Sequence, residues 1–406
     1  MTSVLPGARA GLLAAVCALA LTTAACQASG TTATPEAIGS GSPRAEATPS
    51  DPPVAPVRVS TNLGRKTKAV PVSTTLQVSA EGGTLRKVSV AAGDTTLPGK
   101  LNADKTGWKA SGRLEPGLDY VVSSVAVRSD GKVRHRKARF HTQDLTLDQQ
   151  TYPSVAPLQG ETVGVGMPVI VTFDVAVKDH AAFQKHMSVT SSPHQKGSWY
   201  WLSDHEAHWR PARYWKAGTD VTVDVDINSV PAGGGIYGQE SRQVSFHVGD
   251  ANIYKVNAQT HQMTVTQNGK VLRTIPITTG KAGFTTRSGT KVIIEKFRTK
   301  RMNSETVGIS QSNPEYYNID DVEYAMRLTY SGEFIHAAPW SVGSQGYANV
   351  SHGCTGMSTS NAAWLYGISK RGDVVEYTGT DRWMTMTNGY GDWNVPFKEY
   401  KQGSAL

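Results

Sequence analysis

One cysteine and two histidines form the group of residues in this chain that is best suited to chemistry. Cys354 follows His352 by two positions, and His336 lies sixteen positions before His352. A free thiol has a pKa of about 8.5, so little of it is thiolate at neutral pH unless a base or a positive charge assists. Imidazole groups supply both kinds of assistance. The spacing therefore makes Cys354 a candidate nucleophile for acyl transfer.

The cysteine count supports a reactive thiol at this position. The chain has three cysteines, and Cys17 and Cys26 lie in or at the end of an N-terminal export segment. An exported protein that loses this segment keeps no disulfide partner for Cys354. Such an unpaired cysteine favours a reactive thiol, with a buried, inert cysteine as the alternative.

The export segment itself has the pattern of a signal peptide. Arg9 precedes an apolar run from Gly11 to Leu21, and small residues lead into Cys26. The run is too short to span a membrane, which takes about 20 residues. Small residues before a cysteine resemble a bacterial lipoprotein processing site, although Thr23 stands where such sites usually have Leu. We expect a signal peptide over residues 1–26 with Cys26 as a lipid anchor at the outer face of the cytoplasmic membrane; plain secretion is the alternative.

The remainder of the chain divides into a tether and several folded units. Residues 27–56 contain almost no large apolar side chains and predict a tether without a core. Short alternating runs with turn signals, such as Ser129-Asp130-Gly131-Lys132, predict antiparallel β-structure over residues 57–146 and 147–250. Arg139-Phe140-His141 is followed about one hundred residues later by a similar run, Ser245-Phe246-His247. This period fits two immunoglobulin-like sandwiches in a mainly β protein.

A third unit, residues 251–380, contains the candidate nucleophile. Asn268-Gly269 between two alternating runs, 261–267 and 270–275, predicts a type I′ hairpin. Further strands are expected at 291–295, 324–330 and 373–377, and a short helix at 358–370. Cys354 would then lie just before the helix, whose amides and dipole would favour a thiolate and an oxyanion.

The residues around Cys354 resemble a known family signature. His336-Ala337-Ala338-Pro339-Trp340 followed by Ser351-His352-Gly353-Cys354 resembles the YkuD-like L,D-transpeptidases, which cross-link bacterial peptidoglycan. The Asn268-Gly269 hairpin and Lys370-Arg371-Gly372-Asp373 fit the same pattern. The sandwiches, the anchor and a tail over 381–406 resemble multidomain actinobacterial members, in which this tail packs on the second sandwich.

The resemblance implies a reaction and a role for each residue of the signature. Cys354 would attack a tetrapeptide stem between its third and fourth residues, release D-alanine and form a thioester, which a diamino-acid side chain of a neighbouring stem resolves. His336 would be the general base, with its tautomer fixed by a backbone carbonyl, and His352 would orient the substrate or the loop. The amides of Gly353 and Cys354 would bind the oxyanion, with support from Ser351. Neither a metal nor an organic cofactor is implied.

The resemblance also implies substrate-binding residues and one departure. Met302 and Tyr317 match a lid over the site, although the adjacent Tyr316 leaves the register open by one residue and ordinary packing is the alternative. At Gly356 the family usually has a polar side chain. The residues implied to bind substrate are Tyr317, Met302, Trp340, Gly332 and Ser331.

Two other function classes stay open at this stage. An L,D-carboxypeptidase would use the same Cys354 and His336 but transfer the acyl group to water. A non-catalytic wall-binding protein would need a degenerate site, which the intact residues argue against. The transpeptidase interpretation adds stem peptides as partners, carbapenem β-lactams as covalent inhibitors, and the membrane through Cys26.

Other motifs carry less chemistry. His205-Glu206-Ala207-His208 lacks the i, i+4 histidines of a helical zinc site, so we expect a solvated loop and no metal. Gly233-Gly234-Gly235 predicts a hairpin turn. The formal net charge is +8, and an exported protein meets anionic wall polymers and lipids before any nucleic acid, so no nucleic acid is expected as a partner.

Overall fold

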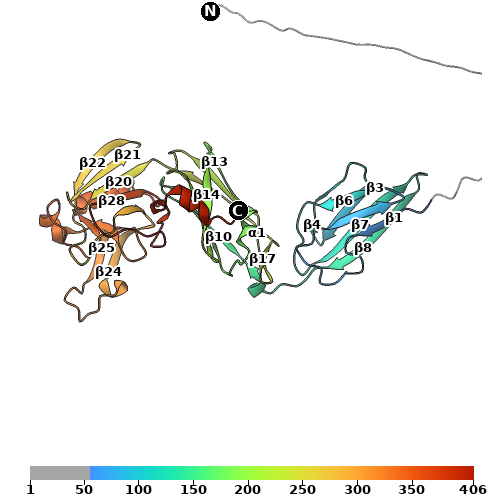
Figure 1. Cartoon of the computed structure of the whole chain (residues 1–406), viewed down its shortest axis with the longest axis horizontal. Helices are drawn as coiled ribbons and strands as arrows, with labels where there is room; N and C mark the ends of the chain where they lie inside the picture. The colour runs from blue at the N-terminus through green and yellow to red at the C-terminus, as the bar shows by residue number, and fades with distance from the viewer. Residues whose placement is uncertain (1–54) are drawn as a thin grey trace, which may run out of the picture. The chain divides into compact units, whose positions relative to one another are not determined.

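The computed structural model describes residues 55–406 and is built mainly of β-strands (Figure 1). The predicted signal peptide, Cys26 and nearly all of the predicted tether lie outside these residues. No helix in the described range is long and apolar enough to cross a membrane.

The first unit is a sandwich of two four-stranded sheets around one apolar cluster. Leu85, Trp108 and Tyr120 are among its buried side chains. The predicted turn at 129–132 joins the antiparallel strands β7 (Asp119–Arg128) and β8 (Val133–His141), which confirms the hairpin. The sheets have the orders β1 (Arg58–Thr61), β2 (Gln77–Glu81), β6 (Gly107–Ala110), β5 (Gly99–Leu101) and β4 (Thr95–Thr96), β3 (Gly83–Ala92), β7 (Asp119–Arg128), β8 (Val133–His141).

The second unit is also a sandwich, with a small additional sheet. The glycines 233–235 turn the chain between β17 and β18, all three with positive φ, which confirms the predicted hairpin turn. A short helix, α1 (His180–Gln184), is capped by Asp179. The sheets have the orders β10 (Pro153–Ala156), β12 (Val169–Phe173), β15 (Glu206–Pro211), β14 (Gly197–Ser203); β11 (Thr162–Val163), β19 (Arg242–Val248), β16 (Asp220–Val225), β13 (Met187–Ser192); and β17 (Pro231–Gly233), β18 (Ile236–Gly238), β9 (Gln150–Thr151).

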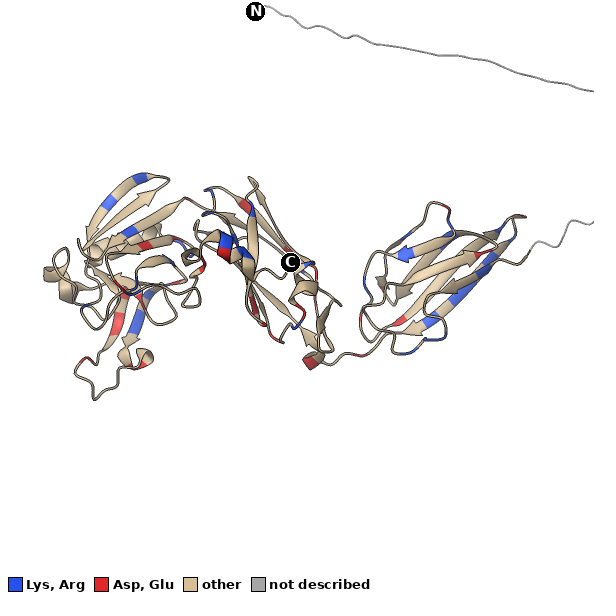
Figure 2. Cartoon of the chain, viewed as in Figure 1, with Lys and Arg blue, Asp and Glu red and all other residues tan. Residues whose placement is uncertain are grey.

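The positive charge of the chain is concentrated on the first sandwich. Residues 57–146 contain 16 Lys and Arg against 7 Asp and Glu, whereas residues 251–406 contain 16 against 12. Figure 2 shows Lys and Arg along β8 of the first sandwich. The unit that carries Cys354 is therefore much closer to neutral than the first one, and its chemistry depends on local charges.

The third unit contains two sheets with α2 (Thr359–Ile368) beside them. A five-stranded and a four-stranded sheet enclose an apolar cluster that includes Tyr254, Ile275 and Met326. The sheets have the orders β22 (Lys270–Pro276), β21 (Gln262–Gln267), β20 (Asn252–Asn257), β28 (Val374–Thr378), β23 (Gly289–Val292) and β24 (Glu295–Asn303), β25 (Asn318–Arg327), β26 (Phe334–Ala337), β27 (Thr355–Met357). The short helices are η1 (Leu147–Gln149), η2 (Ser304–Val307), η3 (Pro339–Ser344), η4 (Asp392–Asn394), α3 (Phe397–Tyr400) and η5 (Lys401–Gly403).

Most predicted elements of the third unit are present. Asn268 and Gly269 have φ values of 49° and 81° in the turn between β21 and β22, as a type I′ hairpin requires. Ser358 caps α2 by accepting a hydrogen bond from the N–H of Asn361. The long strand β24 was not predicted, because its mostly charged and polar residues do not alternate with apolar ones.

The position of Cys354 relative to the helix differs from the prediction. Strand β27 lies between Cys354 and α2, and it pairs in parallel with β26 so that His336 is opposite Gly356. The first helical residue is Thr359, five positions after the cysteine. The dipole effect falls off within about one turn, so α2 is too far along the chain to act directly on the thiol.

The His205–His208 motif is not the solvated loop that we expected. His208 lies on β15 with 1% of its surface exposed. Its Nδ1 lies 3.0 Å from Oδ1 of Asp392, and its Nε2 lies 2.9 Å from Oε1 of Glu206. Tyr400 donates a hydrogen bond to the same Asp392 oxygen. The prediction failed because the partner carboxylate lies 184 residues away in the C-terminal tail.

This buried pair predicts a pH-dependent stability. Burial alone would lower the pKa of His208, but the carboxylates of Asp392 and Glu206 raise it to about 9. A raised histidine pKa contributes stability below the unfolded value of about 6.5 and loses it as the pH rises to about 9. Calorimetry should therefore show the unfolding temperature falling over this window. Asp392→Asn should cost about 3–5 kcal/mol at pH 6 and flatten the decline, whereas an unchanged slope would contradict this account.

Candidate active site

Cys354 lies where two cavities meet. Its thiol is largely buried, with 9% of the residue exposed, and Sγ donates a weak hydrogen bond to the carbonyl oxygen of Gly332 at 3.6 Å. One cavity, of about 250 Å³, is lined by Cys354, His336, His352 and Trp340 among others. The second, of about 140 Å³, is lined by Cys354, Gly332 and residues of β24. The sulfur can therefore be reached from two sides.

His336 is held in one tautomer by the backbone of β26. Its Nδ1 lies 2.7 Å from the carbonyl oxygen of Ala337. A carbonyl oxygen only accepts, so Nδ1 carries the proton and Nε2 is left as a hydrogen-bond acceptor. Burial lowers the pKa of His336, which keeps the ring neutral at pH 7. His336 is thus a neutral imidazole with a free basic nitrogen that lines the same cavity as the thiol.

The thiol is also neutral, which differs from the pre-formed thiolate that the sequence suggested. Burial raises the pKa of Cys354 to about 12, and the backbone N–H of Phe334 offsets only part of this shift. A thiol in an apolar setting ionises only when a base removes its proton. The resting site therefore pairs an SH group with a neutral histidine.

Ser351 and Gly353 organise the loop that ends at Cys354. The hydroxyl of Ser351 donates to the carbonyl oxygen of Cys354 at 2.6 Å and accepts the N–H of Gly353 at 3.1 Å. Gly353 has a φ of 124°, which a residue with a side chain rarely adopts. Ser351 thus supports the loop, but its bond occupies the Gly353 N–H that the sequence analysis assigned to an oxyanion.

His352 contacts a segment that borders both cavities at Cys354. Residues 304–317, between β24 and β25, form this segment, which we call the lid. Nε2 of His352 lies 2.7 Å from Oε2 of Glu315, and Lys281 Nζ lies 2.6 Å from the same oxygen. His352 therefore links the catalytic loop to the lid.

Four of the five expected substrate-binding residues line a cavity at Cys354, and Ser331 is the exception. Tyr317 lines both cavities, and its ring lies 5.0 Å from that of His352, which places Tyr317 and not Tyr316 at the site. Met302, at the end of β24, lines both cavities as well. Trp340 is 57% exposed and stacks on His336 with ring centroids 5.8 Å apart.

Ser331 and Gly332 differ in how they relate to the sulfur. The Gly332 carbonyl accepts the thiol, and this residue also lines the smaller cavity. The Ser331 N–H donates to Asn388 Oδ1 at 2.9 Å, and Asn388 Nδ2 donates to the Ser331 hydroxyl at 2.8 Å. Ser331 does not line either cavity at Cys354 among residues 55–406. Asn388 of the tail thus holds the Ser331 loop.

Gly356 has no room for the polar side chain that the family usually places there. A Cβ on Gly356 would lie 2.8 Å from Cβ of Ala338 and 3.1 Å from Cγ2 of Thr278. The backbones of Thr278 and Gly356 exchange two hydrogen bonds of 2.9 Å, which fixes this close approach. The neighbours of Gly356 are thus matched to a glycine.

The close packing around Gly356 can be tested by adding a side chain there. Gly356→Asn should force β26 and β27 apart, displace His336 and slow acylation of Cys354 by about tenfold or more, because overpacking shifts the backbone. Stopped-flow acylation by a carbapenem measures this rate. A Gly356→Ala variant should be affected less, because it adds only a methyl group. Faster acylation by the Asn variant would show that the site lacks a polar group.

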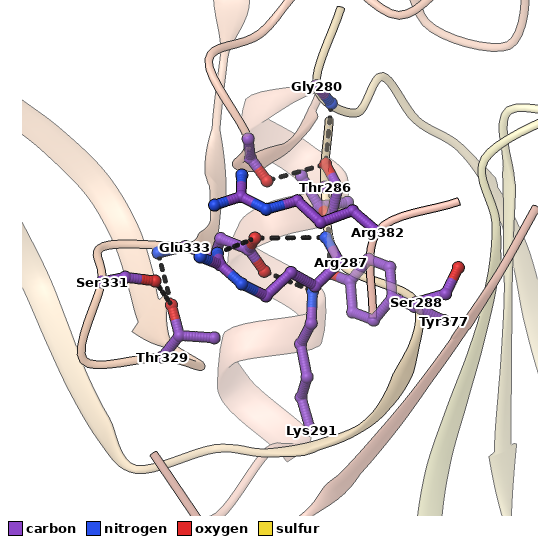
Figure 3. A network of polar contacts seen from close by, with 12 residues as sticks. Gly280, Thr286, Arg287, Ser288, Lys291, Thr329, Ser331, Glu333, Tyr377 and Arg382 are labelled. Carbon is purple, nitrogen blue, oxygen red and sulfur yellow. Dashed lines mark hydrogen bonds and ion pairs between the residues drawn. The ribbon is translucent and has the colours of Figure 1, made fainter. Parts of the chain in front are cut away.

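Figure 3 shows a buried charged network around Glu333 that the sequence motifs did not predict. Lys291 of β23 forms an ion pair with Oε2 of Glu333, and Arg287 Nη1 lies 2.8 Å from Oε1 of the same carboxylate. Lys291 is 0% exposed and Glu333 is 5% exposed. In the sequence, Lys291 and Glu333 each directly precede an apolar pair, Val292-Ile293 and Phe334-Ile335, but nothing there indicates that the two side chains meet.

Comparison with known proteins identifies the family. Residues 251–376 match the family model of the L,D-transpeptidase catalytic domain, and residues 67–231 match that of a bacterial Ig domain. Over 339 residues the chain is 36% identical to L,D-transpeptidase 2 of Mycobacterium tuberculosis, covering 83% of this chain and 82% of the relative. L,D-transpeptidase 5 of the same species is 30% identical over 374 residues, covering 87% and 78%.

A solved structure agrees with this assignment. The structure of the LD transpeptidase LdtMt1 in complex with imipenem matches with a TM-score of 0.50 and 39% identity, over 55% of this chain and 97% of that one. No group of three or more His, Cys, Asp or Glu side chains that could hold a metal ion is present in residues 55–406. The fold, the Cys354 and His336 pair and the relatives lead to one conclusion: the chain belongs to the L,D-transpeptidases.

Proposed function

We propose that this enzyme cross-links peptidoglycan between the third residues of stem peptides through a thioester on Cys354. The observation that carries the proposal is that Cys354 and His336 line one cavity while the Ala337 carbonyl holds Nδ1 of His336, which leaves its Nε2 free to accept a proton. Two neutral partners suit a reaction in which one proton moves back and forth.

The first half-reaction forms the thioester. His336 Nε2 takes the proton from Sγ as the sulfur attacks the carbonyl carbon between the third and fourth residues of the donor stem. The backbone N–H of Cys354 donates to the developing oxyanion. The carbon–nitrogen bond then breaks, the imidazolium gives its proton to the departing amine, and D-alanine leaves. The acyl group remains on Cys354.

The second half-reaction transfers the acyl group to a neighbouring stem. The side-chain amine of the acceptor's diamino acid attacks the thioester, and His336 takes a proton from this amine. The carbon–sulfur bond breaks, and the returning proton restores the thiol. The two cavities at Cys354 provide separate approaches for donor and acceptor. This arrangement favours transpeptidation over hydrolysis by a carboxypeptidase.

Covalent labelling tests the proposed nucleophile. A relative of this chain has been solved in complex with imipenem. We expect a carbapenem to acylate Cys354, because its β-lactam carbonyl presents the same electrophile as the donor peptide. The intact mass should rise by one drug mass, carried by the peptide that contains Cys354, and prior alkylation should block the adduct. A folded protein that forms no adduct at any drug concentration would contradict the proposal.

Product analysis separates the two enzyme classes. With a disaccharide tetrapeptide as donor and acceptor, a transpeptidase yields a cross-linked dimer together with D-alanine. A carboxypeptidase yields D-alanine and a tripeptide without dimer. Dimer formation in proportion to D-alanine supports the cross-linking function, and its absence would assign the enzyme to hydrolysis.

An L,D-transpeptidase acts on the cell wall, so this protein is exported. We propose further that Cys26 carries a lipid anchor, because small residues precede it at the end of an apolar run. Stable anchoring takes more than one acyl chain. The native protein should partition into detergent with the membrane fraction, and Cys26→Ser should release it. A mature N-terminus at any other residue would instead favour plain secretion.

A further inference from the structure

The buried ion pair behind Cys354 has no place in the proton transfers described above. Lys291 Nζ pairs with Glu333 and lies 3.7 Å from the centre of the Tyr377 ring. A buried ion pair costs so much desolvation that it is weak evidence for stability. Its position next to the nucleophile points instead to a role in the reaction.

Glu333 holds the segment on one side of the sulfur. The Gly332 carbonyl accepts the thiol, and the Phe334 N–H lowers the pKa of Cys354. Between these two residues, the Glu333 carboxylate accepts from Arg287 Nη1 at 2.8 Å and from the Arg287 backbone N–H at 3.2 Å. The carboxylate thus fixes two backbone groups that act on Sγ.

Residues 286–291, which supply the partners of Glu333, also hold the loop that ends at Cys354. The Thr286 hydroxyl donates to the carbonyl oxygen of Gly353 at 2.8 Å and accepts the N–H of Gly280 at the same distance. Arg287 follows Thr286 directly, and Lys291 lies four residues further along. Figure 3 shows Arg287 and Lys291 both reaching Glu333, whereas Thr286 bonds to Gly280. Residues 286–291 therefore support both neighbours of the nucleophile.

The charges of the pair act on the thiol in opposite directions. The charge of Glu333 raises the pKa of Cys354, and that of Lys291 lowers it. Burial lowers the pKa of Lys291 itself to about 8, although Glu333 opposes this shift. The titratable and charged groups that face Lys291 are Glu333, Arg287 and Tyr377. Those that share a cavity with the thiol are His336, His352 and Tyr317.

We propose that Lys291 is a positioning residue for the transfer reaction: by pairing with Glu333 it cancels a carboxylate that would otherwise oppose a thiolate at Cys354. The proposal rests on Cys354 being the nucleophile. The Glu333 carboxylate holds the backbone of Gly332 and Phe334 in place. The positive charge of Lys291 offsets the repulsion between this carboxylate and a thiolate at Cys354.

Opposite effects of two variants test the proposal. Alkylation of Cys354 by iodoacetamide reports the thiolate directly and needs no substrate. At pH 7, Lys291→Met should slow alkylation by about tenfold, because one pH unit in the thiol pKa changes the thiolate fraction tenfold. Glu333→Gln, which keeps the side-chain shape, should speed it by about threefold. A structural role alone would change the alkylation rate of both variants in the same direction, and that result would overturn the proposal.

The pH profile adds a second readout. Lys291 loses its charge as the pH rises through about 8. The difference between the native enzyme and Lys291→Met should therefore shrink from about tenfold at pH 7 to less than about threefold at pH 9.5. A constant difference would contradict a charge effect. If a carbapenem does not react with Cys354, the role of Cys354 as the nucleophile is refuted. The alkylation rates of the two variants test only the role of the Lys291–Glu333 pair.

An exposed pair provides the matched control. Arg298 and Glu323 form a salt bridge of 2.8 Å on β24 and β25, with 56% and 39% of their side chains exposed. Glu323→Gln should leave the alkylation rate unchanged. Thermal melting identifies any variant that does not fold. Unfolding would expose the buried thiol and speed its alkylation, so misfolding cannot mimic the slower rate of Lys291→Met, and the gain of Glu333→Gln counts only if its melting profile matches that of the native enzyme.

Discussion

Cys354→Ala is expected to abolish D-alanine release and cross-linking, with a loss of at least about 10⁴-fold. The reason is that the methyl group cannot form the thioester on which both half-reactions depend. No other side chain that lines either cavity at this position has a thiol. Chromatographic detection of D-alanine from a disaccharide tetrapeptide measures the effect.

The control for this variant is binding without chemistry. Cys354→Ala removes one sulfur from a largely buried position, so the folded protein should retain its melting profile and its affinity for the tetrapeptide. Titration calorimetry can follow binding because the substrate is not consumed. A Cys354→Ala enzyme that still releases D-alanine would mean that another residue carries the acyl group.

The parts of the site that are close in the sequence were predictable. Cys354, His352 and Ser351 are adjacent, and His336 lies one strand away, so their spacing indicated a thiol with a base. The tautomer of His336 also followed expectation, because its partner is the carbonyl of the next residue, Ala337.

Features that depend on distant partners were not predictable. Glu333 and Lys291 are 42 residues apart, and a single sequence gives no sign that their side chains meet. His208 looked exposed because Asp392 lies far along the chain. The long strand β24 lacks an alternating apolar pattern because none of its residues is fully buried. The missing information is tertiary in each case.

The electrostatic state of the site was also beyond the sequence. Motif reasoning favoured a thiolate stabilised by a helix, whereas burial gives a neutral thiol and a neutral imidazole. Burial penalises both the thiolate of Cys354 and the imidazolium of His336. We therefore expect the proton to move from the thiol to the imidazole as the sulfur attacks the substrate, which shares the developing charge.

His336→Ala should reduce acylation at pH 7 by about 10²–10⁴-fold, which is the usual contribution of a general base. The residual rate should rise about tenfold per pH unit, because without the imidazole only hydroxide-dependent ionisation of the thiol produces the nucleophile. This rise should continue up to high pH, since burial raises the pKa of Cys354 to about 12.

The native enzyme should behave differently, because burial lowers the pKa of His336. His336 must be neutral to accept a proton, so the native rate should be flat near pH 7 and fall only below the ordinary histidine value of about 6.5. Stopped-flow acylation between pH 5 and pH 10 compares the two enzymes, with His352→Ala as the control, since His352 contacts Glu315 and not the thiol. That variant should lose less rate than His336→Ala and keep the flat profile. If His352→Ala instead acquired the steep alkaline rise and His336→Ala did not, His352 would be the base and the tautomer at Ala337 would serve only to position the His336 ring.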